Sequence, residues 1–325
     1  MSGRTLEPGQ ARGHAGFTWA DHVDWMVATA GSLAAVAERL CARRGHEESV
    51  ASAERALRRL RERGQEDGGK WGVRALAVFG VPDAADARAR WMGAYHSRFT
   101  DLPVSVCEDL VRFWDRPPLS QSRGSRIWLS LAHATCALRR GDEESARASL
   151  EQARRALPGA PASAQVELLL TDAFLASRHA VDEVPSRLSA IEPLLGALPD
   201  TDFPYLHVRW IDQRAYHINK KKDFAGAEAL YRALPERGSP AFVLCRRANG
   251  LAYARWKQGH LDEARALARE AARQAGDGGH VRMRAMALAM LGRILRGPEG
   301  EDAKARAIAI ARQLDDENLR LRFER

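Results

Sequence analysis

The chain has 325 residues, a formal net charge of +8, 45% apolar residues and 28% charged residues. This balance excludes an intrinsically disordered chain, and no apolar run approaches the ~18 residues that a transmembrane helix needs. The four cysteines lie too far apart in the sequence for a metal motif or a disulfide framework. We therefore expect a folded protein of the reducing cytoplasm that does not enter membranes.

The first part of the chain reads as a tail followed by short helices. Residues 1–16 are rich in glycine and lack hydrophobic periodicity, which predicts a flexible tail. Residues 17–118 carry successive helical patterns, and we assign them to an N-terminal helical domain. Within it, residues 21–64 hold three short helical patterns, with a predicted turn at residues 43–48 before the third. The inward face of the third pattern is expected to hold Val50, Ala53, Leu57 and Leu60.

These three patterns resemble a helix-turn-helix unit, in which the second helix of the motif enters the major groove of DNA. The basic third pattern keeps its arginines off the buried face, and the candidate DNA-binding residues are Arg55, Arg58, Arg59 and Arg63. The turn before it is longer than the usual three or four residues. A basic amphipathic helix is often only a solvated face, so the alternative is a helical cap packed on the rest of the chain.

Three further helical patterns follow in the same domain, at residues 71–79, 84–99 and 104–114. In the second of them, Trp91, Tyr95 and Phe99 are spaced by four, which predicts an apolar seam on one helix. Basic residues interleave with these aromatics, so stacking on nucleic acid is the alternative. The proline- and serine-rich run at residues 117–125 predicts a domain boundary, and we assign residues 119–325 to a second domain.

The second domain repeats a helix hairpin. Its clearest units turn at Gly141, Lys222 and Gly259, and alanines recur at three- and four-residue spacing after the turns. One hairpin cannot bury its apolar face alone, so several must stack. The glycine turns predict a left-handed backbone at residues 141 and 259. Close helix contacts predict that three alanines are buried, namely Ala146, Ala264 and Ala268.

This pattern resembles the tetratricopeptide repeat (TPR), and the match is best around Gly141 and Gly259. The resemblance covers roughly the last two thirds of the chain and implies an α-solenoid of about five helix hairpins. The predicted fold class is therefore all-α, with an N-terminal helical, helix-turn-helix-like domain followed by a TPR-like solenoid. The alternative is an irregular helical bundle.

In tetratricopeptide repeats the first helix of each hairpin lines a concave, ligand-binding face. The resemblance implies that the peptide- or protein-binding residues are Arg209, Tyr216, Asn219, Lys220, Arg246, Asn249, Tyr253, Lys257 and Arg293. Asn can bond a peptide backbone while Arg and Lys hold an anion. The implied partner is a peptide or protein with an acidic or carboxylate element. The alternative is that these are ordinary solvated residues of an arginine-rich protein.

Motifs that carry chemistry are missing from the sequence, which has no glycine-rich phosphate loop, no His-Glu-x-x-His and no Cys-x-x-Cys. We therefore expect a binding protein rather than an enzyme, with no metal and no cofactor; an enzyme with an unrecognised site is the least favoured class. The favoured function is a DNA-binding transcriptional regulator whose solenoid senses a peptide or protein. The alternative is a scaffold or adaptor of a larger assembly. The candidate partners are a peptide or protein, duplex DNA and a second copy of the chain in a homodimer.

Overall fold

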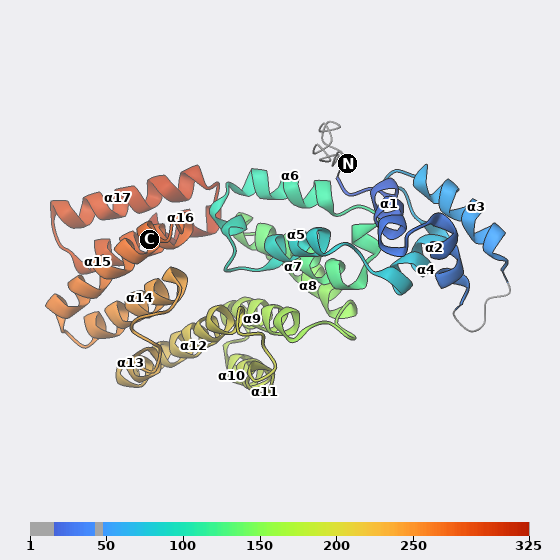
Figure 1. Cartoon of the computed structure of the whole chain (residues 1–325). Helices are drawn as coiled ribbons and strands as arrows, with labels where there is room; N and C mark the ends of the chain where they lie inside the picture. Colours follow the sequence, from blue (N-terminus) through green and yellow to red (C-terminus); the bar gives the residue numbers. More distant parts are fainter. Residues whose placement is uncertain (1–15, 43–47, 325) are drawn as a thin grey trace, which may run out of the picture. The chain divides into compact units, whose positions relative to one another are not determined.

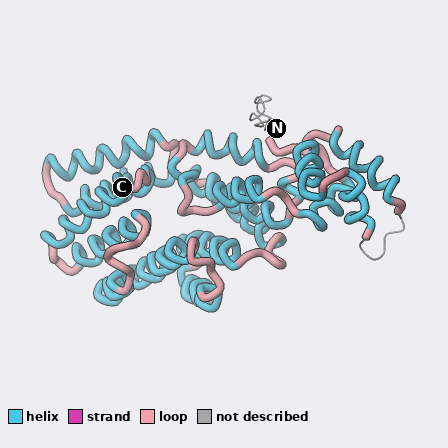
Figure 2. Tube along the Cα trace, in the orientation of Figure 1, coloured by secondary structure: helices cyan, strands magenta, loops and turns pink. Residues whose placement is uncertain are grey.

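The computed structural model describes residues 16–42 and 48–324, and this part of the chain consists of helices and loops without strands (Figures 1 and 2). The predicted all-α fold class is therefore confirmed. The chain divides into two compact units, residues 1–87 with 112–125 and residues 88–111 with 126–325. Most of the predicted tail (residues 1–15) and of the predicted turn (residues 43–47) lies outside the described residues.

The first unit contains four helices, and a side chain caps the start of the first three. They are α1 (Trp19–Ala30), α2 (Leu33–Cys41), α3 (Val50–Arg61) and α4 (Gly69–Phe79). Thr18 and Asp21 form a reciprocal capping box at the start of α1. Ser32 and Ser49 accept backbone N–H groups at the starts of α2 and α3. Each cap satisfies donors that the first turn of a helix leaves free.

The core of the first unit is built around Trp19, which is fully buried and donates its indole N–H to the carbonyl of Glu66 at 2.8 Å. Gly68 lies directly against the indole, because a Cβ on this residue would stand only 2.3 Å from the ring. The inward stripe of α3 is confirmed: Ala53, Leu57 and Leu60 are buried and Val50 packs against the same cluster. The opposite face of α3 is therefore left to solvent.

Two helices, α5 (Asp83–Gly93) and α6 (Val104–Trp114), and two short 3₁₀ turns, η1 (Arg98–Asp101) and η2 (Leu119–Gln121), follow. The predicted helix over residues 84–99 is wrong in its second half, because α5 ends at Gly93. A Cβ on Gly93 would stand 2.3 Å from the carbonyl oxygen of Trp128, so the last turn of α5 packs directly against the backbone of α7 (Arg123–Arg140). Trp91 and Phe99 still pack edge to face, with ring centroids 5.4 Å apart.

The segment of residues 88–111 was predicted to belong to the N-terminal domain, but the structure groups it with the solenoid. Its contacts explain the difference. The ring of His96 stacks on Tyr205 with centroids 4.4 Å apart, and the carboxylate of Asp101 accepts the backbone N–H of Arg282 at 2.8 Å. These partners lie far along the chain, so no local pattern reveals them.

The second unit is a succession of helix hairpins, as predicted. The hairpins are α7 (Arg123–Arg140) with α8 (Glu143–Arg155), α9 (Ala162–His179) with the short η3 (Val181–Glu183), α10 (Val184–Ser189) and α11 (Glu192–Leu195), α12 (Phe203–Lys220) with α13 (Phe224–Arg232), α14 (Ala241–Lys257) with α15 (Leu261–Asp277), and α16 (Val281–Ile294) with α17 (Pro298–Gln313), followed by α18 (Glu317–Glu324).

The hairpin turns adopt the predicted backbone. Gly141 and Gly259 have φ of 81° and 88°, which confirms the left-handed conformation, and Lys222 reaches φ 64° at the equivalent point without being glycine. The three alanines predicted at close helix contacts, Ala146, Ala264 and Ala268, are fully buried. Small residues at these positions let the two helices of a hairpin approach closely.

The last segment of the second unit returns to its first hairpin. The carbonyl of Leu314 accepts the backbone N–H of Val104 at 2.9 Å, and the Asn318 amide donates to the carbonyl of Leu138 at 3.2 Å. The segment after α17 is therefore attached to the beginning of the second unit. Among the described residues, no helix is both long enough and apolar enough to cross a membrane.

Candidate functional site

The concave side of the second unit encloses a cavity of about 950 Å³. It is lined by the first helix of each hairpin, by α18 and by Tyr95. Eight of the residues that the sequence singled out line it: Arg209, Tyr216, Asn219, Lys220, Arg246, Asn249, Tyr253 and Arg293. The ninth, Lys257, is not among the lining residues, and its ammonium lies over the ring of Trp256, 4.1 Å from the centroid.

Two of these arginines already have an anionic partner in the protein. Arg209 is 5% exposed and donates to the carboxylate of Glu167 at 2.5 Å. Arg246 is 8% exposed and forms an ion pair with Asp212, whose other oxygen accepts the hydroxyl of Tyr231 at 2.7 Å. The sequence led us to expect both arginines to hold an anionic ligand. Each arginine is already neutralised by a carboxylate of the protein. We therefore assign both to the wall of the cavity and not to the binding of an anion.

Tyr95 lies where three arginines of the cavity converge. The guanidinium carbons of Arg209, Arg246 and Arg282 lie 4.5, 5.4 and 5.4 Å from its ring centroid, a geometry that favours cation–π attraction. Its hydroxyl accepts hydrogen bonds from Arg246 at 3.3 Å and from Arg282. Burial opposes ionisation of Tyr95, but the three guanidinium groups lower its pKa below the usual range. The sequence analysis predicted an apolar seam here, with stacking on nucleic acid as the alternative.

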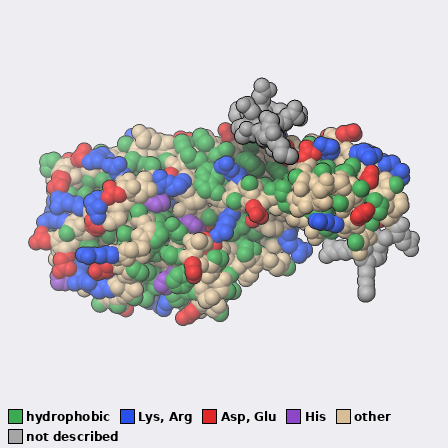
Figure 3. Space-filling model, in the orientation of Figure 1, with side chains coloured by type: hydrophobic (Ala, Val, Ile, Leu, Met, Phe, Trp, Pro, Cys, Tyr) green, Lys and Arg blue, Asp and Glu red, His purple; other side chains and the backbone are tan. Residues whose placement is uncertain are grey.

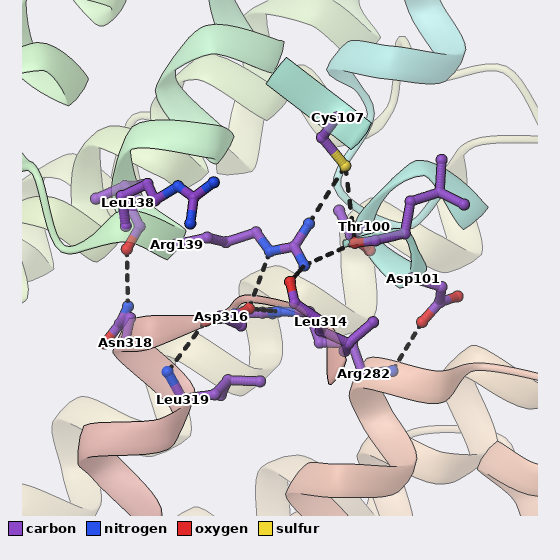
Figure 4. A network of polar contacts seen from close by, with 12 residues as sticks. Thr100, Asp101, Cys107, Leu138, Arg139, Arg282, Leu314, Asp316, Asn318 and Leu319 are labelled. Atoms are coloured by element: carbon purple, nitrogen blue, oxygen red, sulfur yellow. Dashed lines mark hydrogen bonds and ion pairs between the residues drawn. The ribbon is translucent and has the colours of Figure 1, made fainter. Parts of the chain in front are cut away.

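A second buried network joins both ends of the solenoid (Figure 4). One carboxylate oxygen of Asp316 accepts the Nε–H groups of Arg139 at 2.9 Å and of Arg282 at 2.8 Å. Arg139 also donates to the carbonyl of Leu102 at 2.8 Å and to Sγ of Cys107 at 3.5 Å. Burial disfavours the charge on Asp316, yet its two arginines hold its pKa below the usual range. Asp316 is therefore a buried carboxylate that stays ionised.

Two amide side chains of the cavity are left with unused hydrogen-bonding capacity. Asn219 lies on α12 and Asn249 on α14, and both line the cavity. The side-chain oxygen of each is buried and has no hydrogen-bond partner among the described residues. A buried amide oxygen without a partner costs free energy. Each oxygen would gain a hydrogen bond if an N–H donor reached it.

The cavity also has an apolar wall. Met283, Met286 and Met290 follow one another along α16, and Phe174 and Leu321 face the cavity from α9 and α18. Methionine side chains are flexible and polarisable, so they adapt to differently shaped apolar groups. Within residues 16–42 and 48–324, no group of three His, Cys, Asp or Glu side chains is arranged to hold a metal ion.

The candidate DNA-binding residues lie in the first unit on one face of α3 and its C-terminal end. Arg55, Arg58, Arg59 and Arg63 are all exposed. Arg58 pairs with Glu54 one turn earlier at 3.0 Å, and Arg63 donates to the carbonyl of Asp67 at 2.5 Å. Lys and Arg side chains gather over α3 in the space-filling view (Figure 3).

Comparison with known proteins gives a likeness in structure. No protein-family model matches the chain, and no curated protein matches its sequence. The structure resembles the crystal structure of Bacillus thuringiensis PlcR in complex with the peptide PapR7 and DNA, with a TM-score of 0.51 and 10% sequence identity over 94% of this chain and 98% of that one. At this identity the likeness establishes the fold, an N-terminal helix-turn-helix-like unit followed by a TPR-like solenoid.

Proposed function

We propose that the chain is a DNA-binding transcription regulator whose solenoid cavity binds a linear peptide. The observation that carries the proposal is the pair of buried, unpartnered amide oxygens of Asn219 and Asn249 in a cavity of about 950 Å³. This volume lies at the upper end of the usual range for ligand sites. The similar PlcR structure holds both a peptide and DNA, which supports the same pair of partners here.

A peptide suits the cavity better than a compact small molecule. An extended backbone presents an N–H group at every residue, and two amides on successive repeat helices can accept two of them. The methionine wall of α16 offers adaptable contacts for apolar side chains. The surplus of basic groups in the lining favours a peptide with an acidic side chain or a free carboxylate.

The peptide site is tested with Asn249→Ala. Retention of peptides from a randomised linear pool on the immobilised protein should fall for this variant at every salt concentration, because a hydrogen bond to backbone is only weakly screened. Lys257→Ala, a change at a residue outside the cavity lining, serves as the control. Equal retention by wild type and Asn249→Ala would remove Asn249 from the site. Absence of any retained peptide would remove the peptide-binding function itself.

DNA binding rests on the exposed arginine face of α3, the second helix of the α2–α3 pair. Arginines on such a face can neutralise phosphates and reach base edges in the major groove. We include a homodimer in the proposal, because helix-turn-helix proteins commonly place two copies on a two-fold symmetric site. Two chains per duplex in sedimentation would agree with it.

The DNA site is tested with the double variant Arg58→Glu and Arg59→Glu in a mobility-shift assay on a randomised duplex pool. It should lose binding while its helical circular dichroism stays unchanged, and each lost phosphate contact should flatten the salt slope by ~0.9. Arg269→Glu with Arg273→Glu makes the same change of charge on the exposed face of α15 and should keep binding. If wild type binds no duplex at low salt, the regulator proposal fails and the adaptor alternative replaces it.

A further inference from the structure

The basic side chains of the cavity fall into two groups that differ in whether the protein supplies an opposite charge. Arg209 is paired with Glu167 and Arg246 with Asp212. Arg178 is paired with Glu143 at 2.7 Å, and Arg139 and Arg282 share Asp316. These arginines belong to the architecture of the cavity. Removing Arg209 or Arg246 would leave a carboxylate without its counter-charge, and removing Arg139 or Arg282 would take away one of the two charges that stabilise Asp316.

The other group has no carboxylate partner among the described residues. It contains Lys220 on α12, whose ammonium donates to the carbonyl of Ser177 at 3.0 Å, and two arginines, Arg293 on α16 and Arg322 on α18. Both arginines are exposed, both line the cavity, and Arg293 donates to the backbone carbonyl of Arg322 at 3.4 Å. Among the described residues, neither has a carboxylate within ion-pair distance. Both guanidinium groups line the same cavity without a counter-ion. Their like charges repel each other, and an anion placed between them would offset that repulsion.

The charge states of the arginines agree with this division. Burial works against the charge of Arg246, but Asp212 and Tyr95 outweigh it and raise the pKa of Arg246. For Arg322 the sign is opposite: desolvation by the surrounding protein and then the charge of Arg293 lower its pKa. Arg322 is exposed to the cavity, yet protein lies close enough to weaken its hydration. The charge of Asp212 also acts on Arg322, but it does not outweigh these two effects, and Arg322 forms no ion pair with it among the described residues.

We propose that Arg293 and Arg322 form the anion subsite of the cavity and bind a carboxylate of the peptide ligand between α16 and α18. This inference rests on the proposed peptide-binding function and names the residues that select the ligand's charge. Met286 and Met290 precede Arg293 by seven and three residues on α16, so they lie on the same side of the helix. A carboxylate held by Arg293 therefore has an apolar surface next to it, and the residue that carries or precedes the carboxylate is expected to be apolar.

The carboxylate can come from the C-terminus of the peptide or from an Asp or Glu side chain. Both are planar and accept two parallel hydrogen bonds from one guanidinium group. The two sources are separated by selecting binders from randomised linear heptapeptide pools with either a free acid or an amide at the C-terminus. A C-terminal source predicts that retained peptides come from the free-acid pool. A side-chain source predicts retention from both pools with Asp or Glu enriched at one position.

The best retained peptide is then titrated against full-length Arg293→Ala and Arg322→Ala. Each variant should bind about tenfold to a hundredfold more weakly, the range expected for a charge-assisted hydrogen bond, and the loss should shrink when the peptide's carboxylate is replaced by an amide. Arg284→Ala is the matched control, because Arg284 lies exposed on the same helix outside the cavity lining. It should bind as wild type does.

The outcomes distinguish a failure of the anion subsite from a failure of the proposed peptide-binding function. Peptides that bind regardless of any carboxylate, and bind Arg293→Ala and Arg322→Ala as tightly as Arg284→Ala, would overturn the anion subsite and leave peptide binding standing. A carboxylate requirement that survives both substitutions would also overturn it, by placing the anion elsewhere in the cavity. Retention of no peptide from either pool would overturn both proposals.

Discussion

The arginines of α3 and those at the floor of the solenoid cavity share a side chain and differ in their surroundings. On α3, the Arg58 side chain is 61% exposed and its partner Glu54 lies on the same helix. At the floor of the cavity, the Arg139 side chain is 2% exposed and its partner Asp316 is fully buried. The polar groups of the first pair can form hydrogen bonds with water. The donors of Arg139 must find their acceptors within the protein.

This difference separates arginines that are available to a partner from arginines that hold the structure. An exposed pair contributes little because water screens it and side-chain entropy opposes it. A buried pair has already lost its hydration, so removal of one member leaves an uncompensated charge. The same substitution should therefore affect binding in one region and stability in the other.

Asp316→Ala gives the largest expected effect. It leaves Arg139 and Arg282 without their shared carboxylate, and we expect the free energy of unfolding to fall by about 3–5 kcal/mol. Urea denaturation followed by circular dichroism measures the loss. Glu54→Ala, which breaks the exposed pair with Arg58, should cost only about 0.3–0.5 kcal/mol. Equal losses for the two variants would erase the distinction between the regions.

Tyr95→Phe should have a smaller effect on the same unfolding curve. The ring stays under the three guanidinium groups, but the hydroxyl that accepts hydrogen bonds from Arg246 and Arg282 is removed. Hydrogen bonds to charged groups contribute about 1.5–3 kcal/mol, which is the expected loss. Tyr253→Phe is the control, because the Tyr253 hydroxyl has no hydrogen bond within the described residues, and it should leave stability nearly unchanged.

The pH dependence of stability should depend on His96. Burial, followed by the nearby charges of Arg209, Arg90 and His280, lowers the pKa of His96 to about 3. The unfolded state therefore binds a proton below pH ~6.5 that the native state does not bind, so stability falls as the pH drops. The slope from this group approaches ~1.4 kcal/mol per pH unit.

His96→Phe keeps an aromatic ring beside Tyr205 and removes that titration. Unfolding curves of the variant and wild type between pH 7 and 5 should diverge, with wild type losing more stability toward acid. Parallel curves would mean that His96 becomes protonated in the folded protein, and that the positive charges around it are better compensated than their geometry indicates.

The smallest effect on stability is expected from Arg58→Ala combined with Arg59→Ala. Both side chains are exposed on α3, so the free energy of unfolding should stay within about 0.5 kcal/mol of wild type. Thermal unfolding of the double variant tests this. A larger loss would show that these arginines hold the first unit together and would favour the packed-cap interpretation of its helices.

Local patterns predicted the parts of the fold that depend on local physics. The turn glycines, the buried alanines and the inward stripe of α3 each follow from a backbone or spacing requirement within one hairpin or helix. The end of α5 could not be predicted in the same way. The last residue of α5, Gly93, lies against the backbone of Trp128, which is a tertiary contact that no local pattern contains.

In the candidate site, too, the features that follow from local spacing could be predicted and those that depend on distant residues could not. Helical periodicity placed Arg246, Asn249 and Tyr253 on one face, and the structure turns that face to the cavity. Periodicity cannot state which arginines are neutralised, because Arg139 and Asp316 are 177 residues apart. Tyr95 was assigned to an apolar seam for the same reason, since the arginines around it come from three different hairpins.

The return of residues 314–318 to residues 102–104 and 138–139 has a consequence for how the second unit folds. Stacked repeats usually fold through contacts between neighbours, and such contacts form quickly because little chain has to be closed. Here, hydrogen bonds between segments about two hundred residues apart must also form. Synthesis proceeds at ~5–20 residues per second, so two hundred residues take about ten seconds or more. During that time the early hairpins lack the contacts that residues 314–318 provide. We expect a nascent chain with incomplete repeats to expose the unfinished concave side, and to need protection from aggregation until residues 314–318 dock.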